Sequence, residues 1–237
     1  MKLARLIVFC ALAACSAGDE AEEIGNDEPA DYEVDPEDGK GDGVPATFLM
    51  NDVVGDDLFV GTMTVTQVQK FFERSPYGNR SWLADYSANG RSAAQLVIDA
   101  STAERVHPMM LLARMQVEAS LVSKTVKPSS YRIDRALGCG CPDGGGCSAS
   151  YRGFGAQLAC GAKVMRRGYD ESVAGTGTWR KGKTSRTLDP RNVTPVNHAT
   201  ASMYRYTPWV LVGSGGNWLV WNVTRKYVRH AETLGFL

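Results

Sequence analysis

The chain has 237 residues, of which 26 are Lys or Arg and 26 are Asp or Glu, so its formal net charge is zero. The charges are unevenly distributed, because residues 1–42 hold 12 of the acids and only 3 of the bases, which leaves 23 bases and 14 acids in residues 43–237. A domain this basic suits an anionic surface such as a cell-wall polymer or lipid head groups. The bases do not follow an RNA- or DNA-binding motif, so nucleic acid is not an expected partner.

The first residues have the pattern of a secretory signal. Two bases, Lys2 and Arg5, precede an apolar stretch over 6–14 that is too short to span a bilayer. The end of residues 1–15, Leu-Ala-Ala-Cys15, resembles the lipobox of bacterial lipoproteins, in which the cysteine is acylated and begins the mature protein. This resemblance implies an exported protein held at a membrane by lipid on Cys15, and Ser16 in place of an aspartate favours the outer membrane or cell surface. An ordinary signal peptide, giving a soluble periplasmic or secreted protein, is the alternative.

Residues 16–47 are predicted to be a disordered acidic tether. The part from Asp19 to Asp42 contains 12 acids and one base, Lys40. Its few apolar residues cannot offset the entropy cost of ordering the chain. A single globular domain over residues 48–237 is expected to follow, which is long enough to build a hydrophobic core.

Helix signals dominate this domain. Thr64 followed by Gln67 is a capping-box pattern that predicts a helix through about Arg74, and Ser92 followed by Gln95 predicts another through about Arg105. Pro108 suits the first position of a third helix over 109–122, which is apolar around most of its circumference and is therefore expected to be buried. Further helices are predicted over 154–167, from Thr194–Pro195 to Pro208, and over 218–231 after a cap at Asn217. The predicted class is mainly α, with a surface loop or a short β-hairpin near Trp179.

Four cysteines lie in the predicted domain. In an oxidising compartment an even set of cysteines predicts disulfides. Cysteines two positions apart do not bridge each other easily, so the expected pairs are Cys141 with Cys147 and Cys139 with Cys160. Zinc is the alternative, but the spacing lacks the paired C-x2-C pattern of structural zinc sites. We expect no metal and no cofactor.

Glu118 is the candidate catalytic residue. A helical repeat of about 3.6 residues places it on one stripe with Leu111, Met115 and Val122, so the carboxyl is expected to point toward the core. Burial disfavours the charged form and raises the pKa, as a general acid near neutral pH requires. A buried glutamate paired with Arg114 or Arg132 is the alternative.

Several segments resemble, in the right order, the lysozyme-like domains of bacterial lytic transglycosylases and glucosaminidases. The first three are MTVTQVQKFF, SAAQLVIDAS and VHPMMLLARMQVEASLVS, and the later three are RALGCGCPDG, YRGFGAQL and VTPVNHATASMYRYTPWV. Together they extend over most of the predicted domain. The resemblance implies a lysozyme-like helical fold with two lobes around a cleft, and an activity that cleaves the glycan strands of peptidoglycan.

The resemblance also implies roles for particular residues. The helix that follows a P-x-x-L-L-A start carries the family's catalytic glutamate, which corresponds here to Glu118. Gln157 matches the glutamine that follows the catalytic helix, and Tyr204 matches a tyrosine near the acid. The family usually has a serine directly after the glutamate, whereas here Ala119 precedes Ser120, which puts the orienting hydrogen bond in doubt. A helix-surface role for Gln157 and a core role for Tyr204 are the alternatives.

Aromatic side chains are the other candidates for sugar contact. Flat rings in loops and at helix ends can stack on sugar faces, although such residues are more commonly core. They are Tyr151, Phe154, Trp179, Tyr206 and Trp209.

No second carboxylate is as conspicuous as Glu118, because Asp134 and Asp143 lie in a glycine-rich loop, where acids usually serve turns. One acid suffices if a muramic acid hydroxyl closes an anhydro ring, as in transglycosylases, whereas a two-carboxylate hydrolase needs a partner at a defined distance.

Two hypotheses follow. The first is a surface-anchored, monomeric enzyme of the lytic transglycosylase or muramidase/glucosaminidase type. The second is a lysozyme-like module that binds wall glycan or another partner without cutting it. Nucleophilic hydrolase chemistry has little support, because His107, His198 and His230 are isolated in the sequence and no G-x-S-x-G motif is present.

Overall fold

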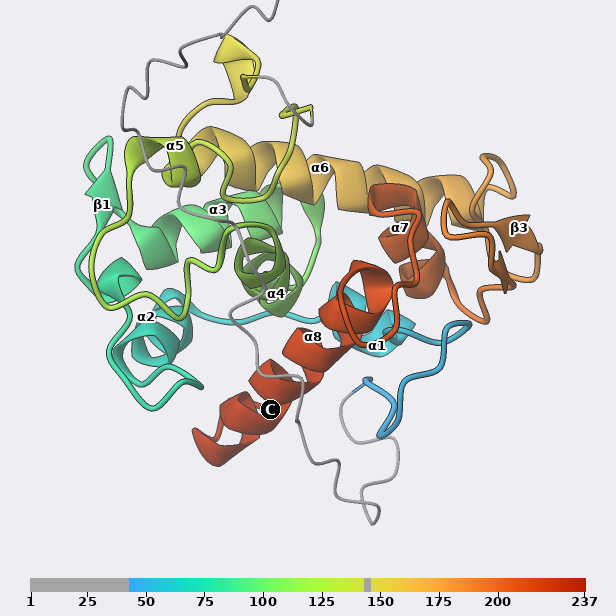
Figure 1. Ribbon diagram of the computed structural model, residues 1–237. Helices are drawn as coiled ribbons and strands as arrows, with labels where there is room; N and C mark the ends of the chain where they lie inside the picture. The colour runs from blue at the N-terminus through green and yellow to red at the C-terminus, as the bar shows by residue number, and fades with distance from the viewer. Residues whose placement is uncertain (1–42, 143–145) are drawn as a thin grey trace, which may run out of the picture.

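The computed structural model describes residues 43–142 and 146–237 (Figure 1). The expected signal peptide over 1–15 with Cys15, the tether over 16–42 and Asp143 lie outside the described residues. The described part is mainly helical, as predicted. Its helices are α1 (Asp56–Val60), α2 (Val65–Glu73), α3 (Ala93–Glu104), α4 (Pro108–Ala119), α5 (Ser130–Ile133), α6 (Phe154–Val173), α7 (His198–Tyr206) and α8 (Gly216–Thr233).

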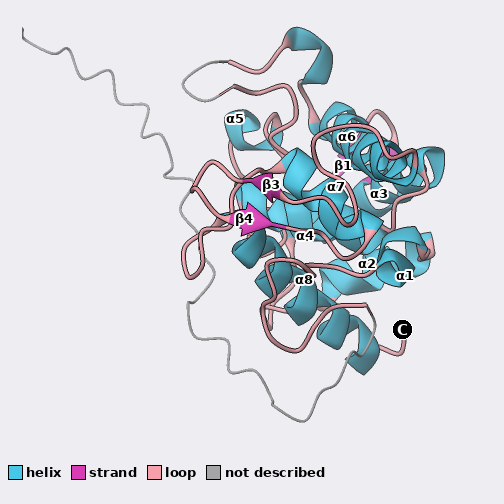
Figure 2. Cartoon of the chain, turned by 90° about the vertical axis from the view of Figure 1, so that its right-hand side faces the viewer, coloured by secondary structure: helices cyan, strands magenta, loops and turns pink. Residues whose placement is uncertain are grey.

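Two short 3-10 helices, Trp82–Ala84 and Ala149–Tyr151, and two small antiparallel hairpins complete the regular structure of the described residues. One pairs β1 (Ser87–Ala88) with β2 (Arg91–Ser92), and the other pairs β3 (Ser185–Arg186) with β4 (Asn192–Val193). The second hairpin confirms the expectation for the segment around Trp179, and Figure 2 shows its two strands beside the helical body. Within the described residues, no helix has both the length and the apolar character needed to cross a bilayer.

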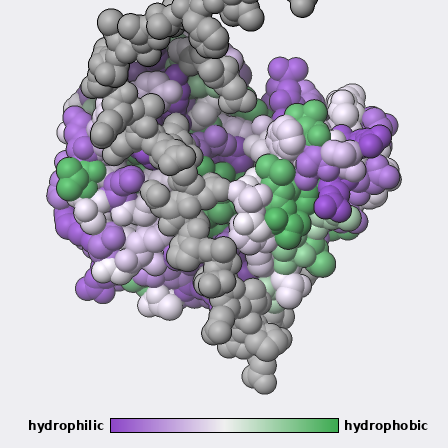
Figure 3. Space-filling view, in the orientation of Figure 1, coloured by the Kyte–Doolittle hydropathy of each residue, from purple (hydrophilic) through white to green (hydrophobic). Residues whose placement is uncertain are grey.

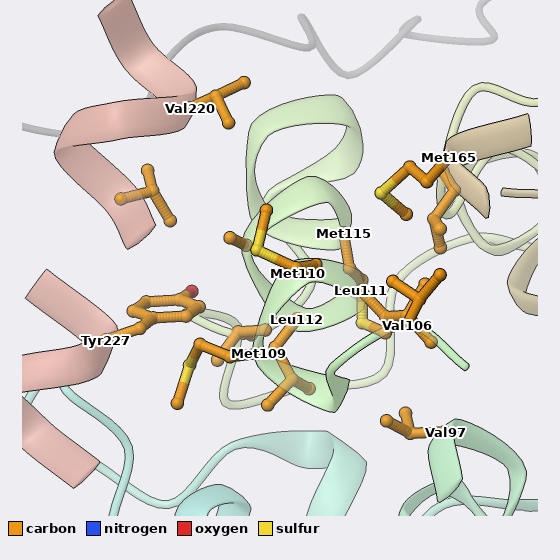
Figure 4. Packing of buried hydrophobic residues seen from close by; sticks show 14 of the residues in the cluster. Val97, Val106, Met109, Met110, Leu111, Leu112, Met115, Met165, Val220 and Tyr227 are labelled. Atoms are coloured by element: carbon orange, nitrogen blue, oxygen red, sulfur yellow. The ribbon is translucent and has the colours of Figure 1, made fainter. Parts of the chain in front are cut away.

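The core surrounds α4, as the sequence predicts. The side chains from Met109 to Leu112 and that of Met115 are fully buried. Figure 4 shows them meeting Val220 and Tyr227 of α8 on one side and Met165 of α6 on another. The helix α6 also packs along α3 and α7, so α4 is enclosed between α8 and the α3–α6 layer (Figure 1).

This central helix ends at Ala119 and does not reach Val122. Ser120 adopts a left-handed conformation with φ of 49°, and its N–H donates to the Gln116 carbonyl, which closes the last turn. Glu118 therefore lies in the final turn of the helix. Val122 is buried, but it is not part of the helical stripe.

The predicted helix caps at Thr64 and Ser92 are confirmed. The Gln67 N–H donates to Thr64 Oγ1 over 3.2 Å, and the Thr64 N–H donates to Gln67 Oε1 over 2.8 Å, which completes a capping box. Ser92 caps α3 by accepting from the Gln95 N–H over 3.2 Å. These bonds satisfy N–H groups that have no partner within the helix.

The helix α6 also differs from its predicted end at 167, because it continues to Val173. Three predicted starting points are wrong as well. The helix α7 begins at His198, capped by Asn197, because Val193 is still paired with β3 and the chain must turn before it coils. The last helix already begins at Gly216, so Asn217 is a helical residue and not its cap. The folded domain begins before residue 48, because Val44 is fully buried and Trp221 Nε1 donates to the Pro45 carbonyl over 2.8 Å.

His107, the residue before α4, is a buried neutral base. Its Nδ1 accepts from the Met109 N–H over 3.0 Å, so the ring replaces the usual Ser or Asp as a helix cap. Gly61 packs closely against the His107 ring, because a Cβ at residue 61 would lie 2.6 Å from His107 Cδ2. Burial lowers the pKa of His107 to about 4, against an ordinary value of 6.5, and a hydrogen bond with the Thr62 backbone opposes this shift.

This depressed pKa predicts a loss of stability in mild acid. Between pH 6.5 and about 4 the unfolded chain binds a proton at His107 that the folded chain does not bind. Stability therefore falls as pH falls through this window, by about 3 kcal/mol over its full width. Urea unfolding at pH 7 and pH 4.5 measures the slope. The His107→Asn variant keeps a capping oxygen and should show a flatter slope, and an unchanged slope would contradict the assignment.

Candidate functional site

Glu118 lies at the end of α4 with its carboxylate partly open to solvent. Its side chain is 28% exposed, whereas Arg114, one turn earlier on the same helix, is 1% exposed. Arg114 Nη2 forms an ion pair with Glu118 Oε1. The arginine pair that the sequence offered as an alternative is therefore present. It does not seal the carboxylate inside the protein.

Arg114 is a buried cation held by residues from two helices and the segment after α7. Its Nη2 also donates to Thr207 Oγ1 over 2.7 Å, and its guanidinium lies 4.2 Å from the ring centroid of Tyr206. Within the described residues, Nε and Nη1 have no hydrogen-bond partner. Burying a charge is costly unless it is paired, so the position of this arginine depends on Glu118, Tyr206 and Thr207 together.

Tyr206 connects this cation to the loop before α6. Its hydroxyl donates to the Leu137 carbonyl over 2.6 Å. Burial, the largest effect, raises the pKa of Tyr206, so the hydroxyl remains a neutral donor at physiological pH. Gly161 of α6 makes room for this contact, because a Cβ there would lie 2.3 Å from Leu137 Cδ2 and 3.2 Å from the Tyr206 hydroxyl.

Gly138 brings the same loop against the carboxylate. Its φ is +67°, which glycine adopts readily, and a Cβ at this position would lie 2.7 Å from Glu118 Oε2. The backbone of the loop therefore packs directly against the Glu118 carboxylate. Neither Gly138 nor Gly161 was predicted as part of the site, because a glycine in a sequence does not reveal which side chain occupies the space it leaves.

Gln157 holds this loop in place. Its Oε1 accepts from the N–H groups of Leu137 and Cys139, both over 3.1 Å. Its Nε2 donates to the carbonyls of Cys139 and Tyr151, both over 2.7 Å. Because the side chain is fully buried, its expected contact with substrate is corrected to a structural role.

The two predicted disulfides cross-link the loop. Cys139 pairs with Cys160 of α6, and Cys141 pairs with Cys147. The first joins the loop directly to the helix that carries Gln157 and Gly161. The described part of the chain contains no group of three or more His, Cys, Asp or Glu side chains that could hold a metal ion.

Asn217 fixes the segment that carries Thr207. It is fully buried in the first turn of α8, and its Nδ2 donates to the Thr207 carbonyl over 2.7 Å and to the Trp209 carbonyl over 3.1 Å. The sequence pattern suggested a helix cap for this residue. Its actual role is to hold irregular backbone beside the buried arginine.

The tyrosine beside the acid is Tyr206 and not Tyr204. Two residues apart on α7, they point to different sides of the helix. Tyr204 is fully buried and stacks on Trp179 with ring centroids 5.0 Å apart. These two aromatic residues form core contacts, which corrects their expected roles in sugar binding.

The remaining candidates divide by exposure. Ser120 is buried and closes α4 through its backbone, and Phe154 belongs to the core, so neither presents a surface to a sugar. Tyr151 and Trp209 are exposed. Tyr151 lies across Gly140, where a Cβ would be 2.2 Å from the ring, so the loop positions this aromatic side chain at the surface.

Comparisons with family models, curated proteins and solved structures found no match for this chain. The geometry around Glu118 and the resemblances in the sequence are therefore the basis for a proposed function.

Removing the Tyr206 hydroxyl should destabilise the protein. The Tyr206→Phe variant leaves the Leu137 carbonyl without this donor, which is expected to cost about 1–2 kcal/mol. Chemical denaturation measures the change. Tyr131→Phe is the matched control, because Tyr131 is exposed and should give no measurable effect. Equal effects of the two substitutions would mean that the bond to Leu137 does not hold the loop.

Proposed function

We propose that the protein cleaves the glycan strands of peptidoglycan, with Glu118 as its single proton donor. One observation carries this proposal. Three of the blocks that resemble lysozyme-like domains come together at Glu118, through α4, the Leu137–Gly138 turn and Tyr206–Thr207. Segments that carry the resemblance are far apart in the sequence, but they form one cluster of contacts around the Glu118 carboxylate.

The chemistry follows from this carboxylate. The protonated Glu118 carboxyl would give its proton to the oxygen of the glycosidic bond as the bond between that oxygen and the anomeric carbon breaks. The anomeric carbon would then be captured by a hydroxyl of the muramic acid residue, giving an anhydro sugar, or by water, giving a reducing end. The attacking hydroxyl or water would pass its proton to the Glu118 carboxylate, which restores the acid. Arg114 fixes the carboxylate through Oε1, so the group is oriented before substrate arrives.

The charge of the domain and its expected location agree with this substrate. Residues 43–237 carry 23 bases against 14 acids, which favours binding to an anionic wall polymer. A lipid anchor at Cys15 would place the protein outside the cytoplasm, where peptidoglycan lies. The proposal therefore includes export to the outer membrane or cell surface.

The ion pair supports a second candidate. A guanidinium beside Glu118 favours the ionised carboxylate, whereas proton donation requires the neutral acid. A lysozyme-like module that binds wall glycan without cutting it would need no neutral form. Activity against isolated peptidoglycan separates the two candidates.

The decisive variant is Glu118→Gln. Incubation of the protein with purified peptidoglycan, followed by mass spectrometry of the soluble fragments, measures cleavage and distinguishes anhydro from reducing ends. The variant should lose about 10²- to 10⁴-fold in rate, since it has no proton to give. Binding to sedimented peptidoglycan should be retained.

Glu73→Gln is the matched control, because Glu73 also faces an arginine, Arg80, at 3.8 Å but lies on α2. It should cleave at the wild-type rate, and thermal unfolding should show that both variants are folded. A wild-type protein that binds peptidoglycan and releases no fragments would favour the binding module. A Glu118→Gln variant that is folded and fully active would remove Glu118 from the mechanism.

A further inference from the structure

A cluster of exposed apolar side chains lies on three adjacent segments of the described chain, 48–52, 187–196 and 208–212. We call this cluster the apolar patch. Seven of the thirteen exposed large apolar residues of the described chain belong to it. They are Leu49, Met50, Leu188, Val196, Trp209, Leu211 and Val212.

Backbone hydrogen bonds make the three segments one continuous surface. The Val196 N–H donates to the Asn51 carbonyl over 2.9 Å, which joins the first segment to the second. The Leu188 N–H donates to the Pro208 carbonyl over 2.8 Å, which joins the second to the third. A pocket of about 560 Å³ opens between them, lined by Phe48, Met50, Val196 and Val212 among others.

The patch is bordered by cations that have no acidic partner. Arg186 and Arg191 are exposed, and neither forms an ion pair within the described residues. Lys181 and Lys183 lie in the segment just before β3. Two acids lie in these segments: Asp52 accepts from Asn197 Nδ2 over 2.8 Å, and Asp189 accepts from the N–H groups of Val210 and Leu211 over 3.0 and 2.9 Å. Figure 3 shows hydrophobic residues gathered near the segment between α7 and α8, with hydrophilic surface beside them.

We infer that this patch docks on an anionic lipid bilayer. Contiguous exposed aliphatic side chains beside unpaired arginines and lysines match the boundary between lipid tails and negatively charged head groups. Trp209 is of the residue type that prefers this boundary. Peptidoglycan consists of sugars and short peptides, so it offers no extended apolar layer into which these aliphatic side chains could insert. The first segment of the patch begins at Phe48, five residues after Gly43, where the described chain starts.

This inference goes beyond the proposed activity and does not depend on Glu118. The patch is built from residues 48–52, 187–196 and 208–212, whereas the Glu118 carboxylate contacts Arg114 and Gly138. Docking would hold the domain in one orientation at the bilayer, which a flexible tether alone does not do.

Vesicle co-sedimentation tests the docking. The probe is the unacylated chain from Ser16 to Leu237, which keeps every described residue, mixed with vesicles of equal parts phosphatidylglycerol and phosphatidylcholine or of phosphatidylcholine alone. Binding should be stronger to the anionic vesicles and should weaken as salt is raised. The double variant Leu188→Asp/Val212→Asp should lower the partition coefficient at least about tenfold, because two aliphatic contacts are lost. Arg186→Glu/Arg191→Glu should abolish the preference for anionic vesicles.

The matched control is Val126→Asp/Val173→Asp. Val126 and Val173 are 76% and 58% exposed, close to the 62% of Leu188 and the 64% of Val212, and the charge change is identical. This control should bind as the wild type does, and all variants should keep the wild-type unfolding temperature.

Other outcomes would overturn the docking proposal. They are no binding to either vesicle, an equal loss in the control, or sedimentation velocity that shows self-association abolished by Leu188→Asp/Val212→Asp. Lost binding to isolated peptidoglycan in that variant, with vesicle binding intact, would assign the patch to the wall. The Glu118→Gln variant should bind vesicles normally, so failure of the proposed cleavage leaves this test unaffected.

Discussion

The buried charge of Arg114 is the constraint on which the arrangement around Glu118 depends. A guanidinium removed from water loses favourable solvation, and only well-placed partners compensate for that loss. Here the partners come from different parts of the chain: a carboxylate on α4, an aromatic face on α7 and a hydroxyl just beyond that helix. If any one of these elements shifted, Arg114 would lose a partner and the lost solvation of its charge would no longer be compensated. The charge therefore couples the position of α7 to that of α4 and sets the geometry of the carboxylate.

Irregular backbone lies beside this charge, and buried amide side chains hold that backbone in place. Gln157 bonds four backbone groups of the loop before α6, and Asn217 bonds two carbonyls after α7. Gln157 provides both donors and an acceptor at fixed angles, whereas Asn217 provides its two donors. The precision of the site thus comes from polar side chains inside the core, while the loops themselves contain few repeating hydrogen bonds.

The sequence was informative where the determining interaction is local. Thr64 with Gln67, Ser92 with Gln95, and Pro108 act within one helical turn, so their pattern could be recognised without any knowledge of the fold. The disulfide pairs could also be inferred, because few pairings of four nearby cysteines are sterically reasonable. The five-residue helix α1 was not predicted, because its N-cap is Gly55, which has no side chain that could form a recognisable cap.

Residues whose roles depend on distant contacts were interpreted less well. Glu118 and Arg114 were correctly paired as an alternative, since they are one helical turn apart. Tyr204 and Tyr206 could not be distinguished from sequence, because the choice depends on which face of α7 meets α4. Gln157 was predicted to contact substrate, whereas its buried side chain bonds a loop whose path no periodicity describes.

The disulfide between Cys139 and Cys160 has a consequence for when the arrangement around Glu118 is completed. Thiols in a reducing cytosol stay apart, so a newly made polypeptide could form its helices there while the segment carrying Gly138 remains fastened only by hydrogen bonds. Oxidation would then be the event that fixes this segment against the end of α4. The redox state of the compartment would therefore determine when the loop is fixed beside the Glu118 carboxylate.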